Sequence, residues 1–192
     1  HNPFEFPSGI SRDEHLGLLM SCFKAGMPLY GPMEMLFYDA VEEVYRRLPE
    51  DRETPVMKDL LQVAREIIEQ TEYAGEIRSN LKSALEVRIG SLTRRSIGKI
   101  FSSAESLPGM SDLLNYPTII ETEHMSNESA CLLILFLLSG LREQIRISQD
   151  REPGSELKHV IVLEEAHNLI GKSDPSSGGE DSSDPKAFAA SY

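Results

Sequence analysis

The chain has 192 residues and carries 31 Asp or Glu against 19 Lys or Arg, which gives a formal net charge of −12. With 40% hydrophobic residues it can bury a core, and this excludes intrinsic disorder for most of its length. The longest uninterrupted apolar run, 130–138, is far shorter than the roughly 20 residues that span a bilayer. No membrane segment is therefore predicted.

The cysteines and the chain ends indicate the setting of the protein. Two cysteines without CxxC spacing are typical of small buried side chains in a reducing compartment, which predicts a cytoplasmic protein. The sequence opens at His1 without Met or a secretion signal, and its last helical pattern stops at Tyr192. We therefore expect a piece of a longer chain.

Helix signals dominate residues 1–107, which we predict to form a mainly helical insertion subdomain. Ser11 with Glu14 three positions later is a capping box, and apolar residues follow it at helical spacing. Gly31-Pro32 and Thr54-Pro55 each place Pro in the first turn of a helix. The predicted helices run from about 12 to 25, from Pro32 to about Pro49, onward from Pro55, and from about 72 to 91.

Residues 108–192 change to a mixed pattern. The runs 118–121 and 159–163 have the β-branched composition of strands, and an apolar helix from 126 to about 149 separates them. Strand, helix and strand in this order form a βαβ unit with a right-handed crossover. The sequence therefore predicts a helix-rich α/β fold.

Two carboxylates follow the predicted strand 159–163. Glu164 and Glu165 lie at its carboxyl end, where open α/β sheets bind their ligands. Phosphoryl transfer needs one acid in the Mg²⁺ sphere and a second acid that orients or deprotonates the attacking water, so adjacent acids at a strand end fit this chemistry. The alternative is that both acids simply end a strand and face solvent.

Two motifs that would assign further chemistry are absent from the sequence. Gly171-Lys172-Ser173 matches the end of a phosphate-binding loop, but Ala166 stands where its first glycine belongs. Gly98-Lys99 fails as well, because Ile100 replaces the hydroxyl residue. His167 lies beside the two acids without an H-E-x-x-H pattern, so no zinc site is predicted.

A basic stretch within 87–104 contrasts with the acidic chain. It contains four cations and no acid, and it is a candidate surface for phosphates or DNA. A solvated helix end, where cations favour the C-terminal dipole, explains the same residues equally well. The four cations are Arg88, Arg94, Arg95 and Lys99.

Several segments together carry a family resemblance. The segment 160–170, Val-Ile-Val-Leu-Glu-Glu-Ala-His-Asn-Leu-Ile, is the most specific of them, and the segments 2–7, 27–32 and 113–121 contribute. In this order they resemble the HerA/FtsK superfamily of hexameric P-loop ATPases, in particular the HerA-like ATPases associated with DNA translocation. Segment 160–170 is similar to the Walker B strand of that family.

The resemblance implies a partial RecA-like P-loop core in 108–192, next to the helical insertion. Glu164 would hold Mg²⁺ through water, Glu165 would be the catalytic glutamate, and His167 would lie beside the ATP. The resemblance also implies a hexameric ring that couples ATP hydrolysis to the translocation or unwinding of double-stranded DNA, and it suggests a nuclease partner. The phosphate-binding loop of the family would precede His1, so the isolated piece is expected to be inactive.

Two other functions remain open from the sequence. One is a non-catalytic helical module for protein interaction, in which the acidic strand end is incidental. The other is a Mg²⁺-dependent hydrolase that uses Glu164 and Glu165, for which Glu121 is the one further carboxylate that the strand pattern offers. An arginine finger is not assigned, although Arg142 and Arg146 lie on the predicted helix 126–149.

Overall fold

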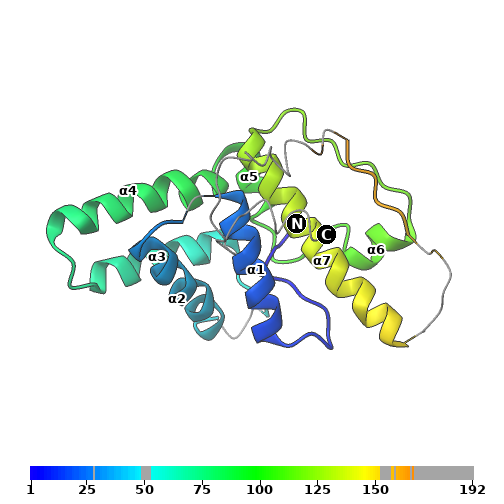
Figure 1. Ribbon diagram of the computed structural model, residues 1–192, viewed down its shortest axis with the longest axis horizontal. Helices are drawn as coiled ribbons and strands as arrows, with labels where there is room; N and C mark the ends of the chain where they lie inside the picture. The colour runs from blue at the N-terminus through cyan, green and yellow to red at the C-terminus, as the bar shows by residue number, and fades with distance from the viewer. Residues whose placement is uncertain (28, 49–52, 152–156, 158, 165, 167–192) are drawn as a thin grey trace, which may run out of the picture. The chain divides into compact units, whose positions relative to one another are not determined.

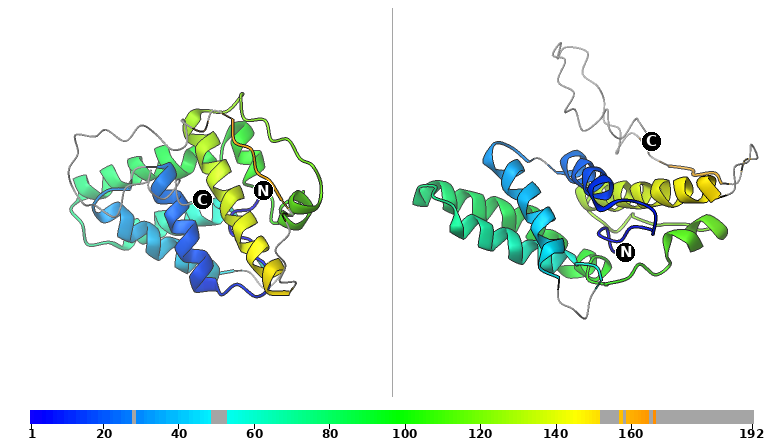
Figure 2. Two further views of the ribbon diagram at one scale, coloured as in Figure 1. Left: turned by 45° about the vertical axis from the view of Figure 1, so that its right-hand side comes forward. Right: turned by 90° about the horizontal axis from the view of Figure 1, so that it is seen from below.

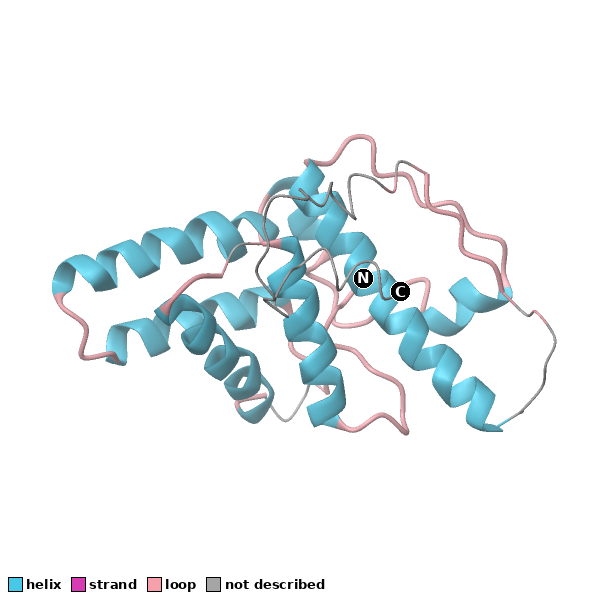
Figure 3. Ribbon diagram, viewed as in Figure 1, coloured by secondary structure: helices cyan, strands magenta, loops and turns pink. Residues whose placement is uncertain are grey.

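The structure is a computed structural model, which describes residues 1–27, 29–48, 53–151, 157, 159–164 and 166. The described residues form seven helices and no strand, and their one β-bridge is an isolated pairing of Ser8 with Ile10 (Figure 3). None of these helices is both long and apolar enough to cross a bilayer. The helices are α1 (Arg12–Gly26), α2 (Pro32–Arg46), α3 (Met57–Gln70), α4 (Gly75–Leu92), α5 (Arg95–Ile100), α6 (Met110–Asn115) and α7 (Asn127–Arg151).

The predicted α/β fold is wrong for the described residues. The helix between the two predicted strands is present as α7, but residues 118–121 and 159–163 form no ladder, so neither a βαβ unit nor a RecA-like core is seen. The side chains of Ile119 and Val162 are 90% and 80% exposed. β-Branched residues favour extended backbone, but a strand also needs a neighbouring backbone to bond with and a surface to cover its side chains. The described chain supplies neither to these runs.

The chain divides into two compact units, of which unit 1 comprises residues 1–6 and 29–109. In this unit α3 packs against both α2 and α4, and α5 follows α4 closely (Figure 1). The apolar residues of α3 recur at helical spacing, and Leu60 and Ile68 are both almost completely buried. The helices predicted from Pro32 and from about residue 72 are confirmed as α2 and α4.

The N-terminal segment of unit 1 is held by a buried asparagine. The side chain of Asn2 donates to the carbonyl oxygens of Pro55 at 2.9 Å and Ala104 at 2.8 Å, and its own oxygen accepts from the backbone N–H of Phe4. The hydroxyl of Tyr45 donates to the carbonyl of Phe4 at 2.6 Å. Because buried polar groups must be paired, these bonds fix the path of the segment.

Unit 2 comprises residues 7–28 and 110–192, and its core lies between α1 and α7. The two helices run side by side in both views of Figure 2. Gly26 lies so close to α7 that a Cβ atom there would approach the side chain of Leu132 to 2.3 Å. The rings of Phe23 and Phe136 meet edge to face with centroids 5.0 Å apart.

The predicted start of α1 is confirmed in its cap. Ser11 has extended backbone, and its hydroxyl accepts from the N–H of Glu14 at 3.3 Å, which satisfies one of the free donors at the helix end. The helix then ends at Gly26, one residue beyond the predicted end.

Candidate functional site

The structure describes one of the two carboxylates of the predicted acidic site. Glu164 is exposed and follows the apolar run 160–163, which forms no strand in the structure. Within the described part of the chain no ion pair engages its carboxylate. Glu165 and His167, which the resemblance places beside ATP, lie outside the described residues.

Few other residues cover the side chains of the apolar run before Glu164. Val160 and Val162 are 66% and 80% exposed, and Ile161 and Leu163 are each more than two-fifths exposed. Burying apolar surface is worth about 25 cal/mol per Å², so an uncovered run of four such residues favours association with further apolar surface. The run that leads to the acids is therefore suited to packing against something other than the described part of this chain.

The described residues hold no group of three or more His, Cys, Asp or Glu that would suit a metal ion. Glu121, the further carboxylate of the hydrolase hypothesis, is exposed in a stretch without regular secondary structure and joins no such group within the described ranges. These residues therefore offer no support for a hydrolase that binds Mg²⁺ with protein carboxylates alone.

The four cations of the predicted basic stretch all lie in unit 1, on α4, on α5 and between these helices. Arg94 donates to Glu86 at 2.7 Å, so part of the charge of the basic stretch is neutralised. Glu86 also binds Arg65. Arg88 is half-buried near the end of α4. Arg95 and Lys99 are exposed near the two ends of the short helix α5, and Arg95 has a positive φ of 54°, outside the helical region. This pair is the part of the stretch best placed to meet a phosphate.

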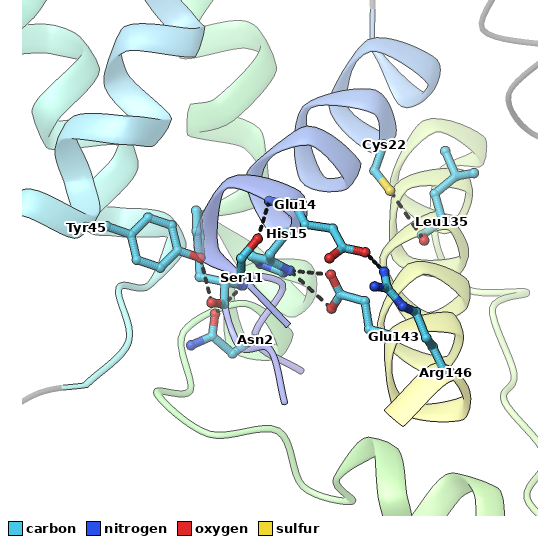
Figure 4. Close-up of polar contacts among 10 residues, drawn as sticks. Asn2, Ser11, Glu14, His15, Cys22, Tyr45, Leu135, Glu143 and Arg146 are labelled. Atoms are coloured by element: carbon cyan, nitrogen blue, oxygen red, sulfur yellow. Dashed lines mark hydrogen bonds and ion pairs between the residues drawn. The ribbon is translucent and has the colours of Figure 1, made fainter. Parts of the chain in front are cut away.

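A buried polar pair joins α1 to α7, as Figure 4 shows. The Nδ1 atom of His15 lies 2.9 and 3.2 Å from the two carboxylate oxygens of Glu143, and the two side chains are only 5% and 2% exposed. Nearby, the exposed side chains of Glu14 and Arg146 form a second ion pair between the same helices. The pairs set the register of α1 on α7.

The thiol of Cys22 belongs to the same buried layer. It lies 3.5 Å from the carbonyl oxygen of Leu135, to which it donates. Burial raises the pKa of this thiol to about 12, and Ser139 opposes the shift through a hydrogen bond. A thiol that keeps its proton at neutral pH is a poor nucleophile and a poor metal ligand.

The His15–Glu143 pair has the form of a base and an orienting acid, but its burial rules out catalysis. A general base must come within hydrogen-bond reach of its substrate, and neither side chain is open to a dissolved molecule. Its role is structural. Sequence reasoning missed the pair, although His15 lies next to Leu16 on the apolar side of α1 and Glu143 continues the buried stripe of Leu132, Phe136 and Ser139.

Comparison with family models, curated proteins and solved structures finds no match for this chain. Assignment of a function therefore depends on the residues themselves.

Proposed function

We propose that this chain is part of a HerA-like ATPase that couples ATP hydrolysis to movement along double-stranded DNA. In this proposal Glu164 holds Mg²⁺ through water and Glu165 activates the attacking water, with His167 beside the nucleotide. Mg²⁺ bound to the ATP would neutralise charge that develops on the phosphates, while the carboxylates keep ion and water in place. The proposed setting is a hexameric ring in the cytoplasm, with a nuclease as its suggested partner.

The observation that carries this proposal is the segment 159–164. Its four apolar side chains at 160–163 are exposed, and the run leads to the exposed carboxylate of Glu164. In a larger assembly other protein surface would cover the run and leave the acid at the edge of the buried region. The exposed Arg95 and Lys99 supply a separate basic surface, as a DNA-handling protein needs.

A turnover assay on the complete protein that contains this chain tests the proposal. We expect Mg²⁺-dependent ATP hydrolysis that Glu165→Gln lowers by at least about 100-fold while ATP binding persists, because that substitution removes only the group that activates water. Glu121→Gln, another acid that follows a β-branched run, is the matched control and should leave turnover unchanged. Unchanged hydrolysis in Glu165→Gln, or a complete protein that does not bind ATP, would refute the assignment.

The DNA part of the proposal has its own control. Arg95→Ala combined with Lys99→Ala should weaken binding of double-stranded DNA and flatten its salt dependence, since each phosphate contact contributes to the salt slope. Lys58→Ala removes an exposed lysine elsewhere in unit 1 and should have no effect. Equal losses in both variants would point to net charge rather than to a surface on α5.

A second candidate is the non-catalytic helical module for protein interaction. It is favoured by the helical character of the described residues, which form two units with their own buried cores. A complete protein that neither binds nor hydrolyses ATP would make this the better account.

A further inference from the structure

A shallow hollow of about 290 Å³ opens on the exposed side of α2 and is lined by Gly31, Glu34, Met35 and Tyr38. These positions are spaced by three and four residues, so they form one stripe along the helix, which we call the α2 face. Met35 is 63% exposed and Tyr38 is 48% exposed, and Tyr30 just before the helix is 75% exposed. Large apolar side chains gathered in this way mark a surface that gains free energy when it is covered.

The first residue of the α2 face is a glycine with an unusual backbone conformation. Gly31 is the N-cap of α2 and has φ +54° with ψ −132°, a conformation that side-chain-bearing residues rarely adopt. A Cβ atom there would meet no other atom within 4 Å, so the glycine is explained by its backbone angles and not by crowding. Pro32 at the first helical position then fixes the direction of the helix.

Acidic residues flank the apolar part of the α2 face. Asp39 follows Met35 by four residues and Glu42 follows Tyr38 by four, so both lie along the same stripe, and both are exposed. Neither forms an ion pair with another described residue. Arg46, the first cation further along the stripe, is bound by Glu43. The face therefore combines apolar contact area with the exposed carboxylates of Asp39 and Glu42.

We propose that the α2 face binds a basic amphipathic helix of a partner protein, which inserts one large apolar side chain into the hollow and aligns Lys or Arg with Asp39 and Glu42. Helices bound in this way place anchors at intervals of three and four residues, the same spacing as the α2 face. The complementary charges speed association and select against acidic partners.

The size of the hollow favours a single side chain over a cofactor. Sites for small molecules usually enclose about 300–1,000 Å³ and bury most of the ligand, whereas this hollow is at the lower limit and shallow. A few aromatic or aliphatic anchors usually carry most of the binding energy in a protein interface. Tyr38 and Met35 are side chains of the kind that form such anchor sites.

Fluorescence anisotropy with a labelled peptide tests the proposal. The probe is an amphipathic peptide of about 18 residues with Leu on one face and Lys on the other, long enough to form a helix on binding. We expect saturable binding that Met35→Ser with Tyr38→Ser weakens by at least about 10-fold and that Glu42→Lys weakens by about 3-fold or more. The exposed acid Glu76, on α4 of the same unit, provides the matched charge control Glu76→Lys, which should change affinity by less than about 2-fold.

Three results would overturn the proposal. Absence of saturable binding is the first, and equal weakening by Glu76→Lys and Glu42→Lys is the second, because it would mean attraction to net charge alone. The third is concentration-dependent dimerisation of the chain in sedimentation velocity that is lost in the Met35→Ser/Tyr38→Ser variant, which would make a second copy the occupant. Circular dichroism of each variant shows whether its helices are intact, and because all substituted side chains are exposed, we expect the variants to fold.

Discussion

Replacing either member of the His15–Glu143 pair should destabilise the protein more than replacing both. In His15→Leu the carboxylate of Glu143 stays in a site where its side chain is 2% exposed, but it loses the partner that lies 2.9 Å away. A buried charge without its partner costs about 3–5 kcal/mol.

The other two variants complete the comparison. Glu143→Leu removes the carboxylate that the Nδ1 atom of His15 meets at 2.9 Å, and a buried polar atom without its partner costs about 1–3 kcal/mol. The double variant His15→Leu/Glu143→Leu removes both polar groups and fills their volume with apolar atoms, so its stability should return to within about 1 kcal/mol of the original protein. The coupling free energy between the two positions should therefore be about 3 kcal/mol or more.

Urea unfolding at pH 7, followed by circular dichroism at 222 nm, measures these differences for the three variants and the original chain. If His15→Leu does not fold, Glu143→Gln gives a milder test of the pair, since it removes the charge while keeping the shape and hydrogen-bonding capacity of the side chain. Additive losses, with a coupling free energy below about 1 kcal/mol, would refute the argument that the pair is desolvated and acts as a unit.

Two further predictions concern single positions. Burial raises the pKa of Cys22 to about 12 from an ordinary value of 9.0, so the thiol should resist alkylation at pH 8 in the folded protein. The free energy of unfolding should fall as pH rises from about 9 towards 12, by up to about 1.4 kcal/mol per pH unit. Urea unfolding at several pH values measures this contribution, which Cys22→Ala should remove. A Cβ on Gly98 would lie 2.4 Å from the carbonyl carbon of Thr93, so Gly98→Ala should lower the free energy of unfolding by about 1–3 kcal/mol. Gly17 has no atom nearby, so Gly17→Ala should raise it by about 0.5–1 kcal/mol. Thermal unfolding measures both changes, and equal effects of the two alanines would contradict this reasoning.

Features decided by neighbouring residues were predictable from the sequence. The cap of α1 at Ser11 involves atoms only three residues apart, and Pro32 marks the start of α2 by its own ring geometry. The long apolar helix α7 was predicted from its composition alone, within about two residues at each end. Local signals of this kind act within one or two turns and do not depend on the rest of the fold.

Features decided by distant residues were not predictable in the same way. The run 159–163 has the composition of a strand, but a strand exists only where another backbone pairs with it, and the described residues pair none there. His15 and Glu143 are 128 residues apart, and nothing in either local pattern identifies the other as a partner. For the candidate site the sequence predicted Glu164 at the end of a buried strand, but the structure shows no strand at 159–163 and leaves the side chains of 160–163 exposed.

The interleaving of the two units affects how the chain is made. About 100 residues separate the end of α1 at Gly26 from the start of α7 at Asn127, and α1 cannot bury its apolar side until α7 has left the ribosome. At about 5–20 residues per second this delay lasts about 5–20 s. Unit 1 can fold during that time, which shortens the effective loop that must close when α7 arrives. A nascent chain in this interval presents Leu19 and Phe23 to chaperones, so translation speed across unit 1 should influence the yield of folded protein.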